Sequence, residues 1–276
     1  MKLFIVGNGF DIAHGMKTSY KDFREFLKTT EKGHHLLNLY PVDDEMWSDF
    51  ESNICMVKTE EITEVNRIWG MDIVYRSLRS DINLQLESFV RGELEKTSNR
   101  IFDGISNQDF AIDFNYTGTL VNTYGLDLKN NVIFIHGSTI MNMFGSPIEK
   151  PLVFGHDGTD FKFDHSSFQK DEHYRDFITA SEKPTKKVIA ENQSFFNKLE
   201  MNRKNIPEVV IFGCSFSKVD SVYFQKVVSI FEGTNTRFSV YYYSDKDKLA
   251  FDNAYLPFFP SERTKLIPEN GWNNHF

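Results

Sequence analysis

Short apolar runs that end in glycine or in a polar residue recur along this chain and constrain its fold more than any other feature. The first run, "KLFIVG", is typical of a buried parallel strand rather than of an amphipathic edge strand. Later runs have the same texture: "FAIDFNYTGTL", "NVIFIHGS", "PLVFGHD", "EVVIFGCSFS" and "FSVYYYS". Strands that alternate with helices form a mainly parallel sheet with helices on both faces. We therefore expect an α/β fold whose last clear strand is "FSVYYYS".

Helical patterns fill the first stretches between these runs. Ser19 and Asp22 form a capping box at the start of "YKDFREFL", which predicts a helix there. Between about residues 60 and 102, apolar residues recur every four positions, which predicts one long helix or two helices broken near Gly70. The recurring residues are Val74, Leu78, Ile82, Leu86, Val90 and Leu94.

Two more helices are expected in the second half of the chain. Residues 185–202 carry a helical apolar pattern that begins at Thr185, directly after a proline. Asp220 is expected to cap the next helix, which ends at Gly233.

Length and composition indicate a chain with an ample core. At 276 residues it can form one large domain or two small ones. A hydrophobic content of 40%, with 27 Phe and 11 Tyr, excludes disorder as a description of the whole chain. We expect a single α/β domain over residues 1–276.

Several classes of function are disfavoured by the same composition. No apolar run approaches the ~20 residues of a membrane helix, and "KLFIVGNGF" is too short for a secretion signal. A net charge of −8 argues against broad binding to nucleic-acid backbone. Cys55 and Cys214 lie far apart, so they form neither a metal pair nor a disulfide framework, which fits a reduced, cytoplasmic chain.

The main functional signal lies where the expected strands end. Ligands of open parallel sheets bind beyond the carboxyl ends of the strands. Here nearly every strand ends in groups that can hydrogen-bond a ligand: Gly-Asn-Gly-Phe-Asp, Phe-Asn-Tyr-Thr, His-Gly-Ser, Gly-His-Asp and Gly-Cys-Ser-Phe-Ser. The sequence therefore predicts a binding site at this edge of the sheet.

The first of these segments, residues 7–11, predicts a contact with phosphate or ribose. Gly7 and Gly9 allow tight turning and close approach of the backbone to a ligand. The dinucleotide fingerprint would place a third glycine where Ile12 stands, and an ordinary strand-to-helix turn can also hold two glycines. Beside Asn8 and Phe10, Asp11 can bind a ribose hydroxyl or cap the turn.

Asn115 and His136 are the candidates for chemistry. The Asn115 amide can donate and accept at once, which suits a sugar hydroxyl or a water, although Asn also closes strands in Asx-turns. Imidazole is the side chain whose charge changes nearest neutral pH, so His136 can take a proton from water or a ribose hydroxyl. A single histidine at a strand end can equally be structural.

The remaining strand ends and one acidic segment have weaker interpretations. His156 and Asp157 suggest a binding or capping loop rather than a metal site, since no Asp-x-His pair stands near the start of the chain. The segment that holds Ser215, Ser217 and Asp220 lacks the second glycine of a nucleophile elbow. We expect these three residues to contact phosphate or ribose.

The segment from Trp47 to Glu51, "WSDFE", is harder to interpret. It either anchors a helical insertion or brings Glu51 to the site, and anchoring is the simpler interpretation.

Taken together, these segments resemble the AbiH family of bacterial abortive-infection (anti-phage) proteins. The resemblance rests on "IVGNGFDIAHGMKTSYKDF", "WSDFE", "FNYT", "IHG", "FGH" and "IFGCSFSKVD", which follow one another in a consistent order. A more distant resemblance is to the sirtuin-like NAD-consuming domains of anti-phage systems. Along their sequences these domains also carry Gly-x-Gly first, then Asn followed by Tyr or Ile, then His-Gly, and last a strand that ends in Gly-x-Ser.

The distant resemblance implies a Rossmann-like, sirtuin-like sheet with a helical insertion after the first strand, which we place at residues 19–103. It makes Asn115 and His136 the counterparts of the residues that act on the nicotinamide riboside bond. It does not imply protein deacetylation, because two isolated cysteines cannot build the four-cysteine zinc module of sirtuin deacetylases. Asp11 also stands where the sirtuin loop commonly has serine.

We therefore expect an anti-phage effector that hydrolyses NAD, its substrate, to nicotinamide and ADP-ribose, with no metal. One alternative is a non-catalytic nucleotide-binding sensor, and another is a metal-dependent nuclease or phosphoesterase using His136, His156 and Asp157. The expected partners are a nucleotide and a phage-derived trigger, without a membrane. A homo-oligomer is left open.

Overall fold

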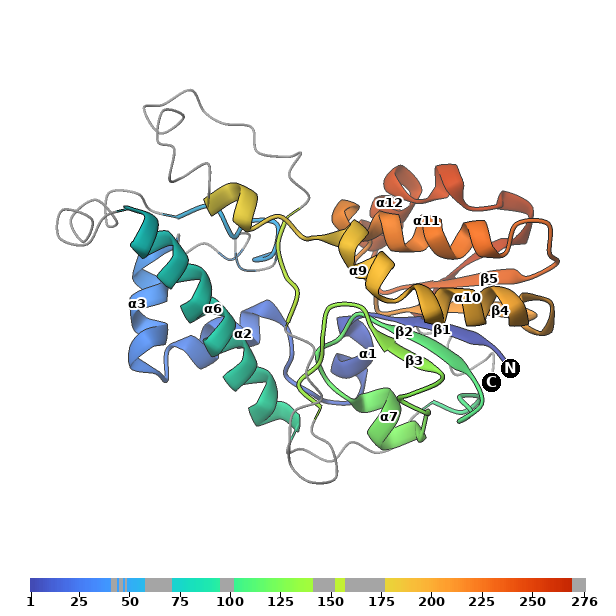
Figure 1. The fold of residues 1–276 in the computed structure, drawn as a ribbon, viewed down its shortest axis with the longest axis horizontal. Coiled ribbons are helices and arrows are strands. Elements are labelled where there is room, and N and C mark those ends of the chain that lie inside the picture. Colours follow the sequence, from blue (N-terminus) through green and yellow to red (C-terminus); the bar gives the residue numbers. More distant parts are fainter. Residues whose placement is uncertain are drawn as a thin grey trace. The chain divides into compact units, whose positions relative to one another are not determined.

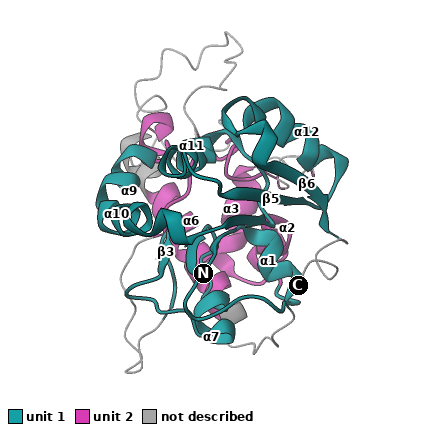
Figure 2. Cartoon of the chain, turned by 90° about the vertical axis from the view of Figure 1, so that its right-hand side faces the viewer, with its two compact units in different colours: residues 1–16, 96–151, 184–276 teal, residues 17–95, 152–183 magenta. Residues whose placement is uncertain are grey.

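The structure is a computed structural model, and it describes residues 1–40, 44, 47, 49–57, 71–94, 102–140, 152–156 and 177–269. The chain divides into two compact units, which Figure 2 shows in different colours. The first unit holds residues 1–16, 96–151 and 184–276, and the second holds residues 17–95 and 152–183. The expectation of one domain, with an insertion over residues 19–103, stays a prediction.

A six-stranded, wholly parallel sheet forms the centre of the first unit. Its strands are β1 (Leu3–Val6), β2 (Phe110–Asp113), β3 (Val132–Phe134), β4 (Glu208–Phe212), β5 (Arg237–Tyr242) and β6 (Thr264–Pro268). They are ordered β3-β2-β1-β4-β5-β6, which is the order of the Rossmann fold. The expected α/β class and parallel sheet are confirmed.

Helices cover both faces of this sheet. On one face, α1 (Asn8–Ala13) and α7 (Thr119–Tyr124) share a buried cluster with alternate strand residues such as Phe4 and Ala111. On the other face, Phe195 of α10 (Gln193–Asn202) packs edge-on against Phe110 of β2 at 5.9 Å. Figure 1 shows α7 on one side of the sheet and α10 and α11 (Ser221–Ile230) on the other. Successive side chains of a strand point to opposite faces, and every residue of β1, β2 and β3 is buried, so both faces of the sheet are apolar there.

The expected helix over residues 185–202 is interrupted. It forms α9 (Thr185–Glu191) and α10, with Asn192 between them. The Asn192 side chain donates to the Val188 carbonyl, four residues back, at 2.8 Å. This local bond competes with a continuous helix, as Asn side chains often do.

The second half of the first unit also contains α12 (Asp245–Ala254) and several short 3₁₀ turns. The turns are η2 (Arg203–Asn205), η3 (Lys218–Asp220), η4 (Leu256–Phe258) and η5 (Ser261–Arg263). The chain also forms β6, a strand that the sequence interpretation missed, since it ended the strands at "FSVYYYS". The segment "TKLIP" is half exposed and ends in proline, so it lacks the apolar texture of the inner strands.

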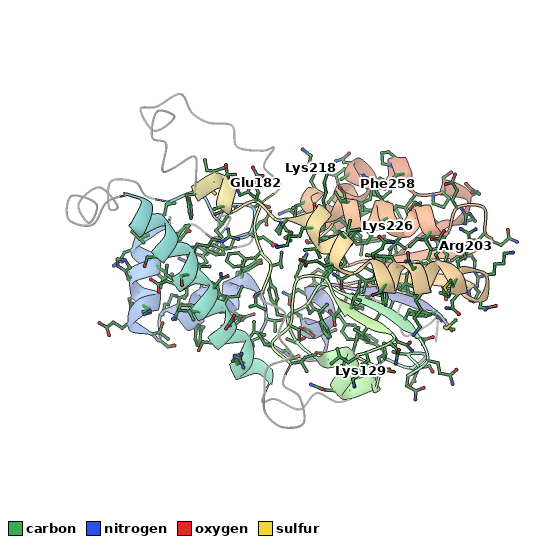
Figure 3. The ribbon with its side chains drawn as sticks, in the orientation of Figure 1. Lys129, Glu182, Arg203, Lys218, Lys226 and Phe258 are labelled. Carbon is green, nitrogen blue, oxygen red and sulfur yellow. The ribbon has the colours of Figure 1, made fainter. Side chains whose placement is uncertain are left out.

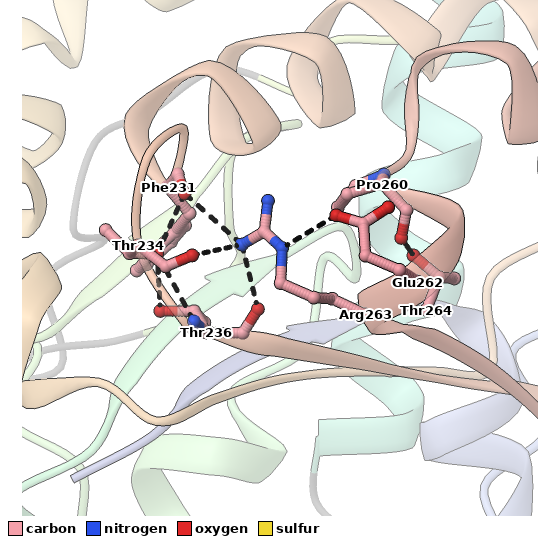
Figure 4. A network of polar contacts seen from close by, with 7 residues as sticks. All are labelled: Phe231, Thr234, Thr236, Pro260, Glu262, Arg263 and Thr264. Carbon is pink, nitrogen blue, oxygen red and sulfur yellow. Dashed lines mark hydrogen bonds and ion pairs between the residues drawn. The ribbon is translucent and has the colours of Figure 1, made fainter.

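An arginine ties β6 to the end of α11. Arg263 donates through Nη1 to the carbonyls of Thr234 at 2.8 Å, Thr236 at 3.1 Å and Phe231 at 3.5 Å (Figure 4). These carbonyls lie at or just beyond the C-terminus of α11, where carbonyl groups lack helical partners. Arg263 therefore acts as a side-chain cap for this helix.

The second unit contains α2 (Tyr20–Leu27), α3 (Glu31–Leu39) and α6 (Met71–Leu94). The expected capping box is present at α2: the Asp22 amide donates to Ser19 Oγ at 3.1 Å, and the Ser19 amide donates to Asp22 Oδ2 at 3.1 Å. In α6 the recurring apolar residues are buried wherever their side chains are described, at Leu78, Ile82, Leu86 and Val90. The expected break near Gly70 lies outside the described residues.

The segment "PLVFGHD" does not form a strand of the sheet, contrary to the expectation. Within its described part, residues 152–156, only one isolated bridge forms, between His156 and Glu182, and it belongs to the second unit. Gly155 explains this irregular path. Its φ is +147°, and a Cβ there would lie 2.0 Å from the Ser181 carbonyl oxygen.

Candidate functional site

The candidate site lies where the order of the strands reverses, between β1 and β4. Four segments follow neighbouring strands at this edge and run into the first residues of the next helix or turn: residues 7–11, 114–119, 136–138 and 213–220. We call them the switch-point loops. In open parallel sheets this reversal is the usual place of a ligand.

The glycines of the first loop are required for packing against the loop after β4. A Cβ at Gly7 would lie 2.5 Å from the Gly213 carbonyl oxygen, and one at Gly9 would lie 2.6 Å from Gly213 Cα. Gly213 itself has φ +68°, and a Cβ there would lie 2.4 Å from the Phe10 nitrogen. Close contact between two backbones therefore accounts for these glycines.

Three backbone amides of the first loop already have acceptors inside the protein. Gly7 donates to the Phe212 carbonyl, Gly9 to the Gly213 carbonyl and Phe10 to the Gly7 carbonyl, each at 2.9 Å. Asn8 also has an interaction partner. The amides expected to hold a phosphate are thus largely committed to the fold.

The loop after β4 differs in this respect. The backbone amides of Cys214, Ser215, Phe216 and Ser217 have no acceptor among the residues that the structure describes. Phe216 has φ +54°, so the loop passes through the left-handed region at a bulky residue. Consecutive unpaired amides in such a turn form a concavity that favours an anion.

Asn115 lies against the first loop. Its side chain is buried and donates through Nδ2 to the Gly7 carbonyl at 3.2 Å. Its backbone amide donates to Asp113 Oδ1 at 2.9 Å. Asn115 therefore joins the end of β2 to the loop after β1.

Asp11 does not point to the surface but ties α1 to the loop after β2. The Thr117 and Thr119 hydroxyls donate to its two carboxyl oxygens at 2.6 Å each, and Asp11 is 1% exposed. Burial raises the pKa of Asp11 to about 6, and the two hydroxyls partly oppose that rise. Asp11 thus holds the two loops together, and Phe10 beside it is a core residue with 0% exposure.

His136 pairs with Asp220 across the site. Its Nε2 lies 3.2 Å from Asp220 Oδ1, and Ser217 Oγ donates to Asp220 Oδ2 at 3.1 Å. Asp220 stands at the N-cap position of α11, as predicted, yet its side chain makes no capping bond there. A carboxylate that leaves its helix to reach an imidazole can set the tautomer of that imidazole.

Aromatic rings surround the His136 imidazole. Phe114, Tyr223 and Tyr116 lie with ring centroids 5.0, 6.0 and 6.4 Å away. His136 is 4% exposed. The ring is therefore held in place on several sides.

Two residues near Asp220 were not given a functional role by the sequence. Burial, followed by the charges of Asp220 and Asp113, raises the pKa of the Cys214 thiol well above its usual value. Burial, followed by the charges of Asp220 and Cys214, also raises the pKa of Tyr255. The Tyr255 hydroxyl donates to the Ser217 carbonyl. Cys214 is therefore a poor nucleophile here.

His14, from the opening motif, lies in an aromatic cluster. Its Nδ1 is 2.7 Å from the Phe10 carbonyl oxygen, and its Nε2 is 2.8 Å from the Tyr124 hydroxyl. Tyr124 accepts the Phe102 amide at 3.1 Å, so its own proton is available for His14. Burial lowers the pKa of His14, which fits a neutral, structural imidazole.

His156 and Glu51 lie in the second unit. His156 is buried with Nε2 3.0 Å from the Ile178 carbonyl oxygen. Glu51 accepts the Gly155 amide at 3.1 Å and pairs with the buried Lys183 ammonium at 2.6 Å. Trp47 stacks on Phe50 with ring centroids 4.9 Å apart. These contacts link the segments of the second unit.

The described residues contain no group of three or more His, Cys, Asp or Glu side chains that could hold a metal ion. Asp157 lies outside the described residues. None of the described helices is both long and apolar enough to cross a membrane.

The structure thus forms two groups of contacts among the switch-point loops. In the first, Asn115 contacts Gly7, beside Gly9 and Gly213. In the second, His136 and Ser217 both contact Asp220. Ser215 lies exposed on the same loop as Ser217. The sequence interpretation missed Asp113, Thr117 and Thr119. A charged residue that ends the otherwise apolar run "FAID" was the available signal for Asp113.

A parallel α/β protein of Rossmann strand order, with polar groups gathered at its switch point, is the class that this fold and site define. The chain belongs to the bacteriophage abortive infection AbiH family, whose model matches residues 3–242. This confirms the family resemblance and supports a role in abortive infection of phage-infected bacteria. Neither the curated proteins nor the solved structures compared with the chain gave a match.

Proposed function

We propose that this protein is an abortive-infection effector that binds NAD at the switch-point loops and hydrolyses it to nicotinamide and ADP-ribose. The observation that supports it most is the pairing of His136 with Asp220 at the same sheet edge where Asn115 reaches the Gly7 carbonyl. The sirtuin-like order of these motifs supports the choice of NAD.

The phosphates of NAD fit the loop after β4 better than the loop after β1. The amides of Gly7, Gly9 and Phe10 are committed to carbonyls, whereas those of Cys214 to Ser217 lack acceptors among the described residues. The exposed Ser215 hydroxyl and the exposed Lys218, labelled in Figure 3, follow on the same loop. A phosphate there would accept hydrogen bonds from the backbone amides, and the positive charge of Lys218 would attract it.

The chemistry follows from the His136–Asp220 pair. An ionised Asp220 only accepts, so Nε2 of His136 donates to it and Nδ1 holds the lone pair. Nδ1 takes a proton from water while the water oxygen bonds to C1′ of the ribose. The bond from C1′ to nicotinamide breaks, and its electron pair neutralises the pyridinium ring. The transition state is oxocarbenium-like, and Asn115 holds the water or the ribose hydroxyls in position as it forms.

Product analysis tests this proposal. Purified protein is incubated with NAD and a lysate of phage-infected cells, and nicotinamide is quantified by mass spectrometry. We expect release by the wild type and a loss of about 10²–10⁴-fold in His136→Ala, the usual range for general-base catalysis. His34→Ala, which changes an exposed histidine, is the control for His136→Ala. Asn107→Ala, which changes an exposed asparagine, is the control for Asn115→Ala. Equal release by His136→Ala and wild type would overturn the proposed mechanism.

A second candidate is a nucleotide-binding sensor without turnover. The close packing of rings around His136, which is 4% exposed, favours it. Its signature is nucleotide binding that is unchanged in His136→Ala, with no nicotinamide released by any variant.

A further inference from the structure

A buried carboxyl group directly beneath Asn115 has no assigned role. Asp113 ends β2, where its carbonyl accepts the Ile135 amide at 2.9 Å and its register partners are Val6 and Phe134. The side chain points to the same face as Ala111, the face that α1 covers. Its position is therefore fixed by the sheet.

The two oxygens of this carboxyl have different surroundings. Oδ1 accepts the Asn115 amide at 2.9 Å, whereas Oδ2 is buried without a hydrogen-bond partner among the described residues. Asp113 is 1% exposed. Neither Asp113 nor Asp11 forms an ion pair in the described part of the chain. An ionised carboxylate with one bare oxygen in such a place is strongly disfavoured, because nothing replaces its hydration.

The titratable groups around Asp113 add to this effect. Asp11 faces it from α1 and Cys214 from the loop after β4, while β1 and β3 present Val6 and Phe134. Burial, and then the nearby charge of Asp11, raise the pKa of Asp113 well above its usual value, and the Asn115 amides oppose this only in part. The surroundings therefore favour the neutral acid.

We propose that Asp113 is a positioning residue that holds Asn115 in place as a neutral acid, an inference that rests on the proposed function of Asn115. The neutral carboxyl accepts the Asn115 amide through Oδ1 without repelling Asp11, and it keeps the proton on Oδ2. Asn115 then keeps its bond to the Gly7 carbonyl and the orientation that a ribose or a water requires. When Asp113 ionises as the pH rises, two buried negative charges face each other and this arrangement loosens.

Two variants and a pH profile test the inference. Asp113→Ala is expected to lower nicotinamide release by about 10²-fold, the usual effect of a small misplacement of a reacting group. Asp113→Asn, a neutral group of the same shape, restores release and removes the decline with rising pH that ionisation of Asp113 causes in the wild type. An Asp113→Asn variant as inactive as Asp113→Ala would overturn the inference, and so would full activity of Asp113→Ala.

A spectroscopic readout keeps the test independent of turnover. In protein with ¹³Cγ-labelled aspartate, the Asp113 carboxyl signal, assigned by its loss in Asp113→Asn, should report a protonated acid at neutral pH. An ionised signal there would refute the inference whether or not NAD is hydrolysed. A protonated signal in a wild type that releases no nicotinamide would retain the neutral acid and refute only the proposed function.

Discussion

At the scale of single residues, two carboxyl groups of the site, Asp11 and Asp113, are buried without an ion-pair partner among the described residues. Asp11 and Asp113 are each 1% exposed, and hydroxyl and amide donors are their hydrogen-bond partners. Hydroxyls stabilise a carboxylate less than a charged partner does, so burial dominates and pKa values rise. The stability of the protein should therefore depend on pH through these acids.

Asp11 allows this dependence to be tested. Its pKa rises from 3.8 to about 6 in the folded protein, so the folded state holds a proton that the unfolded chain has released. The resulting stabilisation is complete below pH ~3.8 and is lost as the pH rises through about 6, by roughly 3 kcal/mol in the free energy of unfolding. Asp11→Asn should lack this loss.

Urea denaturation across that pH range measures the difference. Asp103→Asn, which removes an exposed carboxylate, controls for the change of charge. Parallel pH profiles for Asp11→Asn and wild type would show that Asp11 is already ionised in the weakly acidic range.

At the scale of elements, the contact between the loops after β1 and β4 holds the site together. Gly7, Gly9 and Gly213 meet there at backbone distances that exclude a side chain. The sequence singled out Gly7 and Gly9, but as ligand contacts. Their partner Gly213 lies about 200 residues away, and no local pattern reports a contact at that separation.

Gly213→Ala should therefore lower the free energy of unfolding more than the same substitution at an ordinary left-handed glycine does. The left-handed conformation and the overpacking against Phe10 together predict a loss of roughly 2–5 kcal/mol. Gly125→Ala is the matched control, because Gly125 has φ +73° with nothing within 4 Å of the added Cβ. Chemical denaturation compares the two, and equal losses would contradict the close contact of the loops.

The Arg263 cap makes a second prediction at this scale. Arg263→Met keeps the apolar stem but removes the donors to three carbonyls beyond α11, and should cost about 1.5–3 kcal/mol. Glu262→Gln should leave stability unchanged, because this exposed partner of Arg263 is 71% accessible. Thermal or chemical unfolding of both variants measures this, and an equal effect would assign the stability to the ion pair.

At the scale of the whole molecule, the sequence predicted the strand runs, the parallel sheet and the family. These depend on local texture and on motif order, which the sequence displays directly. It could not predict β6, whose half-exposed pattern resembles a loop, or that "PLVFGHD" leaves the sheet. It also could not predict that Asp220 pairs with His136, because these residues lie 84 positions apart and only the fold brings them together. The bond from the Asn115 amide to Asp113 spans only two residues, and the sequence interpretation missed it.

The role in abortive infection makes a prediction for the cell. If NAD is the substrate, infected bacteria that express the wild type should lose most of their NAD before lysis, and those expressing Asn115→Ala should keep it. Mass spectrometry of extracts taken through infection measures this. Protection from phage with a constant NAD pool would instead favour the sensor.

The central claim, a nucleotide site at the switch-point loops, is tested most directly by amide hydrogen exchange with and without ADP-ribose. We predict slower exchange at Cys214 to Ser217, whose amides would gain phosphate acceptors, and little change at Gly7, Gly9 and Phe10, which already donate to carbonyls. Binding of ADP-ribose that leaves exchange over residues 213–218 unchanged would contradict the claim.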